Sequence, residues 1–208
     1  MKKIPLHWLL IILVCLVALD QASKWYVVMN FDWPVIGRLD TVPVFHTELL
    51  NLDIIRIHNT GVAFGFGNNT QWAPMLFLGV QVVALVWLVW LYRRRYFNTR
   101  LMQISWALVL AGVLGNMADR LLQGFYHPMA VAWGFFEKLS NGYVVDFIDF
   151  SFPWLSNERF VYGCYHWPAF NIADACVCTA AALFLIASFT HTEPTEKQKK
   201  EAEQKPLA

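Results

Sequence analysis

Four long apolar runs, each bounded by polar residues, dominate the chain. They predict membrane-spanning helices at about 6–28, 71–92, 101–120 and 168–190. A helix of about 20 apolar residues crosses a hydrocarbon core roughly 30 Å thick, and each run approaches that length. The second run carries no charge from Gln71 to Tyr92. The pattern therefore predicts a mainly α membrane protein with four transmembrane helices.

The segment between the first two runs follows a different pattern. Val42 to His58 alternates imperfectly between apolar and polar side chains, which predicts one or two short β-strands. Gly61 to Asn69 has the Gly-rich composition of turns. We interpret residues 1–191 as one integral-membrane domain with a small β-strand cradle. The Lys-, Glu- and Gln-rich residues 192–208 are predicted to form a disordered tail.

Composition supports a membrane protein and argues against other classes. Charged residues make up 15% of the chain and apolar residues 57%, whereas soluble domains carry about 25% charged residues. A net charge of +1 without an aromatic-rich basic patch gives no reason to expect a nucleic-acid partner. Three of the four cysteines lie in apolar runs, and Cys164 with His166 is too small a set for zinc. We therefore expect neither a disulfide nor a metal site.

Basic residues set the expected orientation of the helices. Lysines at the start of the chain, the block at 93–100 and the lysines at 197–200 mark the N terminus, the C terminus and the connection between the second and third runs as cytoplasmic. The first run lacks a following small-x-small cleavage site, which favours a retained anchor over a cleaved signal peptide. Residues 29–70 and 121–166 then lie on the outer side.

Seven polar residues fall near the outer ends of three predicted helices. They are Asp20, Lys24, Asn116, Asp119, Arg120, Asn171 and Asp174. Ionisable groups in a membrane are costly and usually face a bundle interior or a wet cavity. Two simpler interpretations stay open: Lys24 and Arg120 could extend to the interface, or Asp20 could form a plain ion pair with Lys24. Neither of these interpretations accounts for Asp174, because apolar residues flank it.

Carboxylates at one depth favour proton-transfer chemistry. Two that approach closely share a proton, which provides one acid and one base near neutral pH. Spacing alone does not choose the partner of Asp174 among Asp119, Asp146 and Asp149. A proton-conducting transporter and a scaffold without chemistry are the other classes. Polar residues gathered at one end only argue against a path through the membrane.

Five ordered motifs give a more specific interpretation. They are DQASK at 20–24, NTGVAFG at 59–65, GNMADR at 115–120, VVDFIDF at 144–150 and PAFNIAD at 168–174. With these motifs the sequence resembles the lipoprotein signal peptidase (signal peptidase II) family along most of its length. The resemblance implies an aspartyl endopeptidase, a hydrolase of the bacterial inner membrane that processes lipoproteins.

The resemblance also implies a role for each motif residue. Asp146 and Asp174 match the family's catalytic aspartates. The positions that match substrate-binding or site-supporting residues are Asn116, Arg120, Asn171, Asn59, Asp20 and Lys24. Asp119 and Gly61 match structural positions near the site. Asp149 matches no catalytic position, and we interpret it as a solvated or interfacial carboxylate.

The implied substrate is a prolipoprotein whose lipobox cysteine carries diacylglycerol and is cut just before that cysteine, near the periplasmic face. The resemblance further implies no metal or organic cofactor, a monomer in contact with membrane lipid, and inhibition by globomycin-type compounds. The chain departs from the family at 124–142 and 156–167, where it is longer. Trp133, Phe135 and Phe136 make the first insertion amphipathic, and we expect a lid or lipid-contacting flap at the interface.

Overall fold

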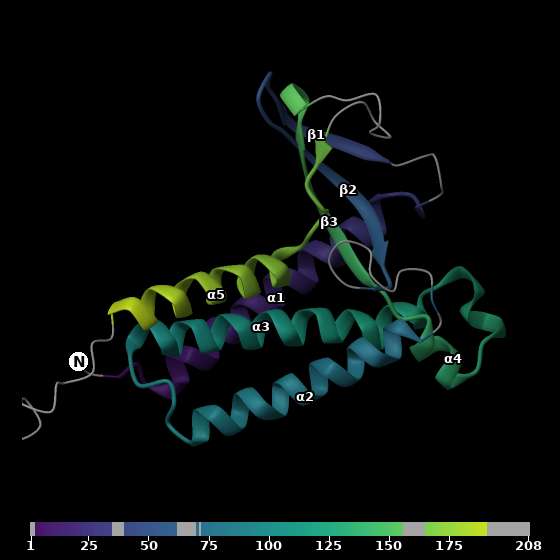
Figure 1. Ribbon diagram of the computed structural model, residues 1–208. Helices are drawn as coiled ribbons and strands as arrows, with labels where there is room; N and C mark the ends of the chain where they lie inside the picture. Colours follow the sequence, from purple (N-terminus) through teal and green to yellow (C-terminus); the bar gives the residue numbers. More distant parts are fainter. Residues whose placement is uncertain (1–2, 35–39, 62–69, 71, 156–164, 191–208) are drawn as a thin grey trace, which may run out of the picture.

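The computed structural model describes residues 3–34, 40–61, 70, 72–155 and 165–190 (Figure 1). Four of the described helices are long and apolar enough to cross a membrane. They are α1 (Leu6–Asn30), α2 (Ala73–Arg93), α3 (Arg100–Leu122) and α5 (Ile172–Thr190). The predicted mainly helical fold with four spanning helices is confirmed. The Gly-rich block from residue 62, Cys164 and the predicted tail lie outside the described residues.

The fourth spanning helix begins at Ile172, later than the predicted start near residue 168. The residues before it form backbone hydrogen bonds with a β-strand. The Trp167 N–H donates to the carbonyl of Phe150, and Phe170 exchanges backbone hydrogen bonds with Ile148. Because those backbone groups pair with a strand, they are not available for a helical turn.

Helix α3 holds the bundle together. It contacts α1, α2 and α5, and its Trp106 and Leu110 pack with Leu9 of α1 in a buried apolar cluster. The Trp106 indole N–H donates to the carbonyl of Leu88 in α2, 3.0 Å away. Most side chains of α2 remain exposed, as a helix surrounded by lipid requires.

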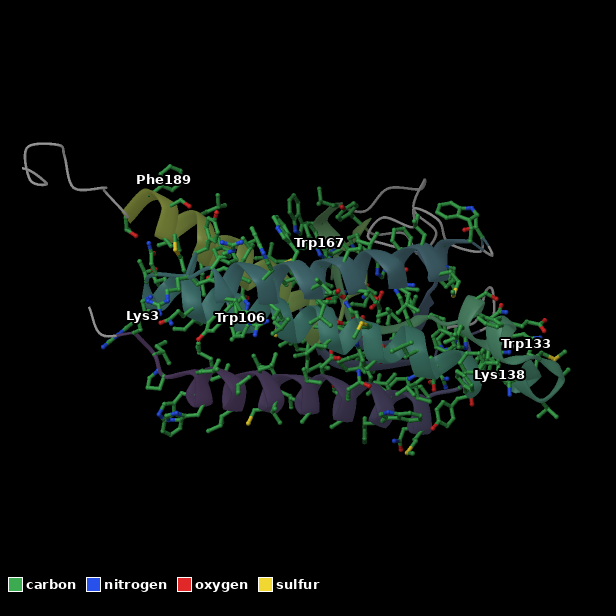
Figure 2. The ribbon with its side chains drawn as sticks, turned by 90° about the horizontal axis from the view of Figure 1, so that it is seen from below. Lys3, Trp106, Trp133, Lys138, Trp167 and Phe189 are labelled. Atoms are coloured by element: carbon green, nitrogen blue, oxygen red, sulfur yellow. The ribbon has the colours of Figure 1, made fainter. Side chains whose placement is uncertain are left out.

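One end of the bundle collects the polar motifs. Helices α1 and α3 finish there and helices α2 and α5 begin there, whereas Lys3 lies at the opposite end (Figures 1 and 2). We call it the site end. At this end α3 approaches α1 closely, since a Cβ on Gly115 would lie 2.6 Å from Oδ2 of Asp20. Only glycine at position 115 leaves room for that carboxylate.

A four-stranded antiparallel sheet projects from the site end. Its order is β1 (Thr41–His46), β2 (Asn51–Asn59), β3 (Val144–Phe152) and β4 (Tyr165–His166). The first two strands confirm the prediction of one or two strands in 42–58, but β3 was not predicted. Val27 and Phe31 at the end of α1 pack with Tyr143, Val145 and Phe147, which fixes β3 against the bundle.

Short elements fill the connection between α3 and β3. They are two 3-10 turns, η2 (Gln123–Phe125) and η3 (Pro128–Ala132), and the helix α4 (Phe135–Ser140). A third 3-10 turn, η4 (Pro153–Leu155), follows β3. The amphipathic insertion predicted at 124–142 is therefore a folded unit, and Figure 1 places it beside the beginning of α2.

Candidate active site

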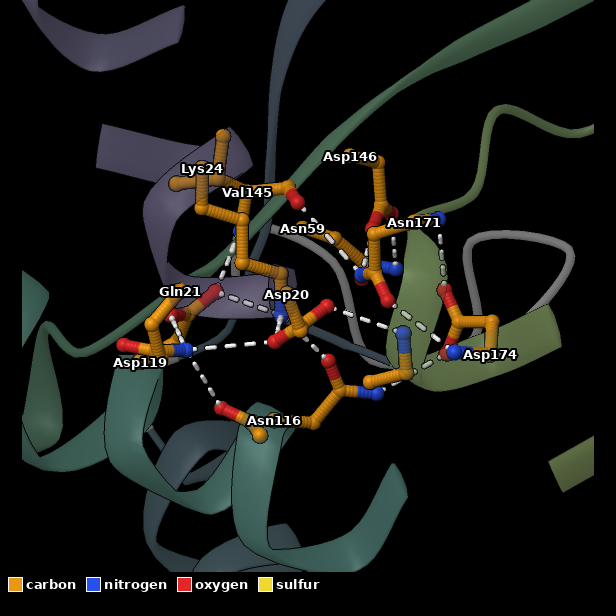
Figure 3. Close-up of polar contacts among 12 residues, drawn as sticks. Asp20, Gln21, Lys24, Asn59, Asn116, Asp119, Val145, Asp146, Asn171 and Asp174 are labelled. Atoms are coloured by element: carbon orange, nitrogen blue, oxygen red, sulfur yellow. Dashed lines mark hydrogen bonds and ion pairs between the residues drawn. The ribbon is translucent and has the colours of Figure 1, made fainter. Parts of the chain in front are cut away.

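Asp146 and Asp174 meet through Asn171 (Figure 3). Asp146 lies on β3 and is 3% exposed, whereas the half-buried Asp174 lies in the first turn of α5. The side-chain amide of Asn171 donates to Oδ1 of Asp146 at 2.7 Å. Its backbone N–H donates to Oδ2 of Asp174 at 3.1 Å. One residue thus binds both carboxylates.

Each carboxylate oxygen of this pair accepts one N–H group. Besides the two donors from Asn171, the amide of Asn59 donates to Oδ2 of Asp146 at 2.9 Å. The amide of Asn116 donates to Oδ1 of Asp174 at 2.8 Å. Donors on every oxygen stabilise negative charge at the pair.

The orientation of all three asparagines follows from their other partners. An amide oxygen that accepts a hydrogen bond leaves its NH₂ group to face the opposite way. The Gly61 N–H donates to Oδ1 of Asn59, and the Asp174 N–H donates to Oδ1 of Asn171. Lys24 Nζ donates to Oδ1 of Asn116 at 2.9 Å. Each carboxylate therefore receives a donor whose direction is set by the fold.

The start of α5 forms a reciprocal cap around the site. Asn171 accepts from the N–H of Asp174, and Asp174 accepts from the N–H of Asn171, as in a capping box. Oδ1 of Asp20 accepts the next free amide, from Ala173, at 2.8 Å. The positive end of the helix dipole favours negative charge at Asp174 and Asp20.

Lys24 lies in the interior and does not extend to the interface. Its side chain is 0% exposed, and Nζ lies 2.9 Å from Oδ2 of Asp20 and 3.1 Å from Oδ2 of Asp119. The alternative that Lys24 extends to the interface is wrong. The ion pair with Asp20 is present, but it is part of a larger network, because the ammonium also contacts Asp119 and Asn116. Asp119 in turn accepts from the backbone N–H of Val145, which ties α3 to β3 next to Asp146.

Arg120 is also buried, so the open alternative that it extends to the interface is wrong as well. Its guanidinium donates to the carbonyls of Thr60 and Gly61, at the end of β2. Lys24 and Arg120 place two cations in the buried part of the site, beside the buried aspartates Asp20, Asp119 and Asp146.

Burial and charge make Asp146 a weak acid. Its removal from water, and then the neighbouring charge of Asp174, raise the pKa of Asp146 from 3.8 to about 7. The hydrogen bonds from Asn59 and Asn171 act in the opposite direction. A pKa of about 7 leaves this group protonated or ionised in comparable amounts at neutral pH.

Asp149 takes a different position from its neighbour in the same motif. It is 6% exposed, and Oδ2 lies 2.8 Å from Nδ1 of His166 on β4. Burial raises the pKa of Asp149, while His166 opposes that shift. Of the two alternatives, a solvated or an interfacial carboxylate, the solvated one is wrong, because Asp149 is buried and paired with His166. No contact joins it to Asp174 among the described residues.

Aromatic rings fix the strand ends that carry Asn59 and Asp146. His58 stacks on Tyr143 with ring centroids 3.8 Å apart. Burial, with the charge of Arg56 next, lowers the pKa of His58 to about 3. Neutral His58 accepts a hydrogen bond from Nε of Arg56, whose guanidinium also donates to the carbonyls of Val28, in the last turn of α1, and of Phe31, just after it.

Sequence reasoning missed Gln21. Its side-chain amide nitrogen lies within hydrogen-bond distance of the Gly115 carbonyl and of Oδ1 of Asp119, each at 3.0 Å, and joins α1 to α3. Its position inside the DQASK motif, next to Asp20, was the available signal. Gly61 contributes its N–H and its carbonyl to the site, and the rest of the predicted Gly-rich block lies outside the described residues.

The fold and the site define a polytopic membrane protein with a buried carboxylate centre at one end of its helices. Two solved bacterial membrane enzymes have similar structures. One, 24% identical, superposes with a TM-score of 0.64 over 100% of this chain and 98% of its own. The other, 26% identical, gives 0.63 over 92% and 98%.

Sequence comparison identifies the family. Residues 12–190 match the family model described as signal peptidase (SPase) II. A lipoprotein signal peptidase of Vibrio cholerae is 30% identical over 91% of this chain and 90% of its own length. One from Nitratidesulfovibrio vulgaris is 33% identical over 87% and 88%. The chain belongs to the signal peptidase II family, which consists of membrane proteases, as its motifs predicted.

Proposed function

We propose that this protein is an aspartyl endopeptidase that removes signal peptides from diacylglyceryl-modified prolipoproteins, with Asp146 and Asp174 as its catalytic pair. The observation that carries the proposal is the double contact of Asn171, which donates to both carboxylates. Family membership and the curated relatives named lipoprotein signal peptidase support the substrate class.

The pair carries one proton in the proposed resting enzyme. Asp146, with its raised pKa, holds it. Asp174 is ionised at the positive end of α5, where its two donors and the helix dipole favour the charge. Such an asymmetric pair supplies one general acid and one general base near neutral pH.

Hydrolysis then follows in two steps. Asp174 takes a proton from water, whose oxygen attacks the carbonyl carbon of the scissile bond, while Asp146 donates its proton to the carbonyl oxygen. The tetrahedral intermediate collapses as the C–N bond breaks and a proton passes from Asp174 to the leaving amine. Asp146 recovers its proton from the hydroxyl group of the intermediate, and the pair returns to its resting state.

The site end faces the periplasm in this proposal, with both termini in the cytoplasm. Basic residues near the opposite end, including the block at 93–95 after α2, support this orientation. A cysteine that carries diacylglycerol lies at the surface of the outer leaflet, level with the start of α5. The enzyme acts as a monomer on membrane-held substrate, and globomycin-type compounds compete for the site.

Purified enzyme in lipid vesicles tests the proposal. It is incubated with one prolipoprotein in two forms, with and without diacylglycerol on the lipobox cysteine, and release of the signal peptide is followed by mass spectrometry. Cleavage just before the modified cysteine, sensitive to globomycin, is expected. Equal cleavage of both forms, or cleavage elsewhere, would exclude the proposed substrate class.

A further inference from the structure

The 124–142 insertion is a closely built element. A Cβ on Gly124 would lie 1.9 Å from the carbonyl oxygen of Lys138, and one on Gly142 would lie 2.1 Å from that of Arg120. Both glycines therefore allow backbone segments to touch at the base of the insertion. Its helix α4 packs against α2 and α3. A defined surface, and not a loose loop, is presented beyond the end of α3.

That surface is apolar. The exposed side chains are Val131 (99% exposed), Phe136 (77%), Phe135 (61%), Met129 (58%) and Tyr126 (57%). Glu137 and Lys138 are the only acidic or basic residues of the insertion apart from His127. A soluble surface rarely gathers so many large apolar side chains, and such a patch marks a contact with lipid or protein.

The apolar surface continues onto the spanning helices on two sides. Tyr126 meets the edge of Trp25 on α1 with ring centroids 4.8 Å apart. Phe136 and Met75 form the apolar side of an open cavity of about 420 Å³ between α4 and the start of α2, whose other lining residues, Glu137, Ser140 and Asn141, are polar. Because α1 and α2 expose apolar side chains of their own, the patch extends the surface that faces lipid.

We propose that the 124–142 insertion is an interfacial membrane anchor, seated among the phospholipids of the leaflet at the site end. Aromatic residues at the ends of spanning helices favour the headgroup region, where rings are partly buried and polar atoms stay wet. The Lys138 ammonium lies 5.5 Å from the ring centroid of Phe125. From there it meets lipid phosphates while its stem covers apolar surface. Figure 2 places Lys138 and Trp133 together at this end, opposite Lys3.

Site-specific photo-crosslinking tests the anchor without reference to peptidase activity. A benzophenone amino acid replaces Val131 or Phe136 in the full chain, held in vesicles of phosphatidylethanolamine and phosphatidylglycerol with an alkyne-tagged phospholipid. Exposed Met29 on α1 is the lipid-facing control, and exposed Asp40, in the loop before β1, is the water-facing control. All four positions are exposed, so the replacements leave packing intact.

The expected result is lipid labelling at Val131 and Phe136 comparable with that at Met29 and at least several-fold above that at Asp40. Labelling at the level of Asp40 would overturn the proposal. Crosslinked dimers in place of lipid adducts would also overturn it, and would assign the patch to contact between copies of the chain.

Discussion

Replacing Lys24 with Met removes the cation at the centre of the polar network. Nζ contacts Oδ2 of Asp20 at 2.9 Å, Oδ2 of Asp119 at 3.1 Å and Oδ1 of Asn116 at 2.9 Å, with no solvent exposure of the side chain. Removing one partner of a buried ion pair costs about 3–5 kcal/mol, because the remaining charge is uncompensated. We expect a loss of that size for Lys24→Met.

Thermal unfolding in one detergent, followed by circular dichroism, measures the loss. Lys138→Met is the matched control, since Lys138 lies over the ring of Phe125 and no ion pair is seen for it among the described residues, and about 0.5–1 kcal/mol is expected. Adding Asp20→Asn to Lys24→Met removes one uncompensated charge and should recover part of the loss. A change below about 1 kcal/mol for Lys24→Met would refute the assignment of Lys24 as the buried counter-ion.

Three other predictions concern the dyad and the insertion. Asn171→Ala frees both carboxylates and should lower the cleavage rate roughly 10²-fold, as misplacement of catalytic groups does, whereas an unchanged rate would exclude a positioning role. Activity should fall as pH rises through about 7, where Asp146 loses its proton. The free energy of unfolding should also fall as pH rises from about 4 to about 7, because in this range the folded state binds a proton that the unfolded state has lost. Asp146→Asn should remove this pH dependence of the free energy of unfolding. Gly124→Ala should cost about 1–3 kcal/mol, while Gly134→Ala, with no atom within 4 Å of its added Cβ, should not destabilise; equal unfolding temperatures would contradict the close packing.

Apolar runs and motif order were sufficient to predict the four helices and the family. Hydrophobic length is a strong signal in a membrane protein, because a spanning helix needs a continuous apolar run. Strand β3 lacked such a signal. Val144–Phe152 is a short, mostly apolar segment with two aspartates, and periodicity alone does not distinguish a buried strand from a buried helical turn.

Burial of the charged residues was not predictable from position along the helices. A lysine or arginine near a helix end extends to water in many proteins, and only tertiary contacts decide otherwise. Lys24 and Arg120 stay inside because Asp20, Asp119 and the end of β2 supply their partners. Asp149 was placed at the surface for the same reason, since its partner His166 lies on a strand that pairs at long range.

In the candidate site, too, some contacts were predictable from the sequence and others depend on the fold. The capping box of α5 was available in the sequence, because Asn171 and Asp174 have the spacing of a helix N-terminus. The hydrogen bond from Asn171 to Asp146 could not be predicted from the sequence, since the distance between them depends on how β3 packs against α5. Position along the helix therefore indicated Asp174, and the family motif indicated Asp146. The fold brings both carboxylates to Asn171.

The proposed dyad is tested most directly by single-turnover cleavage of a diacylglyceryl-modified prolipoprotein with Asp146→Asn, Asp174→Asn and Asp149→Asn. All three variants are first shown to be folded by thermal unfolding. The first two should each lose detectable cleavage, whereas Asp149→Asn, the buried neighbour paired with His166, should retain most of it. Substantial cleavage by either dyad variant, or loss of cleavage confined to Asp149→Asn, would contradict the assignment of Asp146 and Asp174 as the catalytic pair.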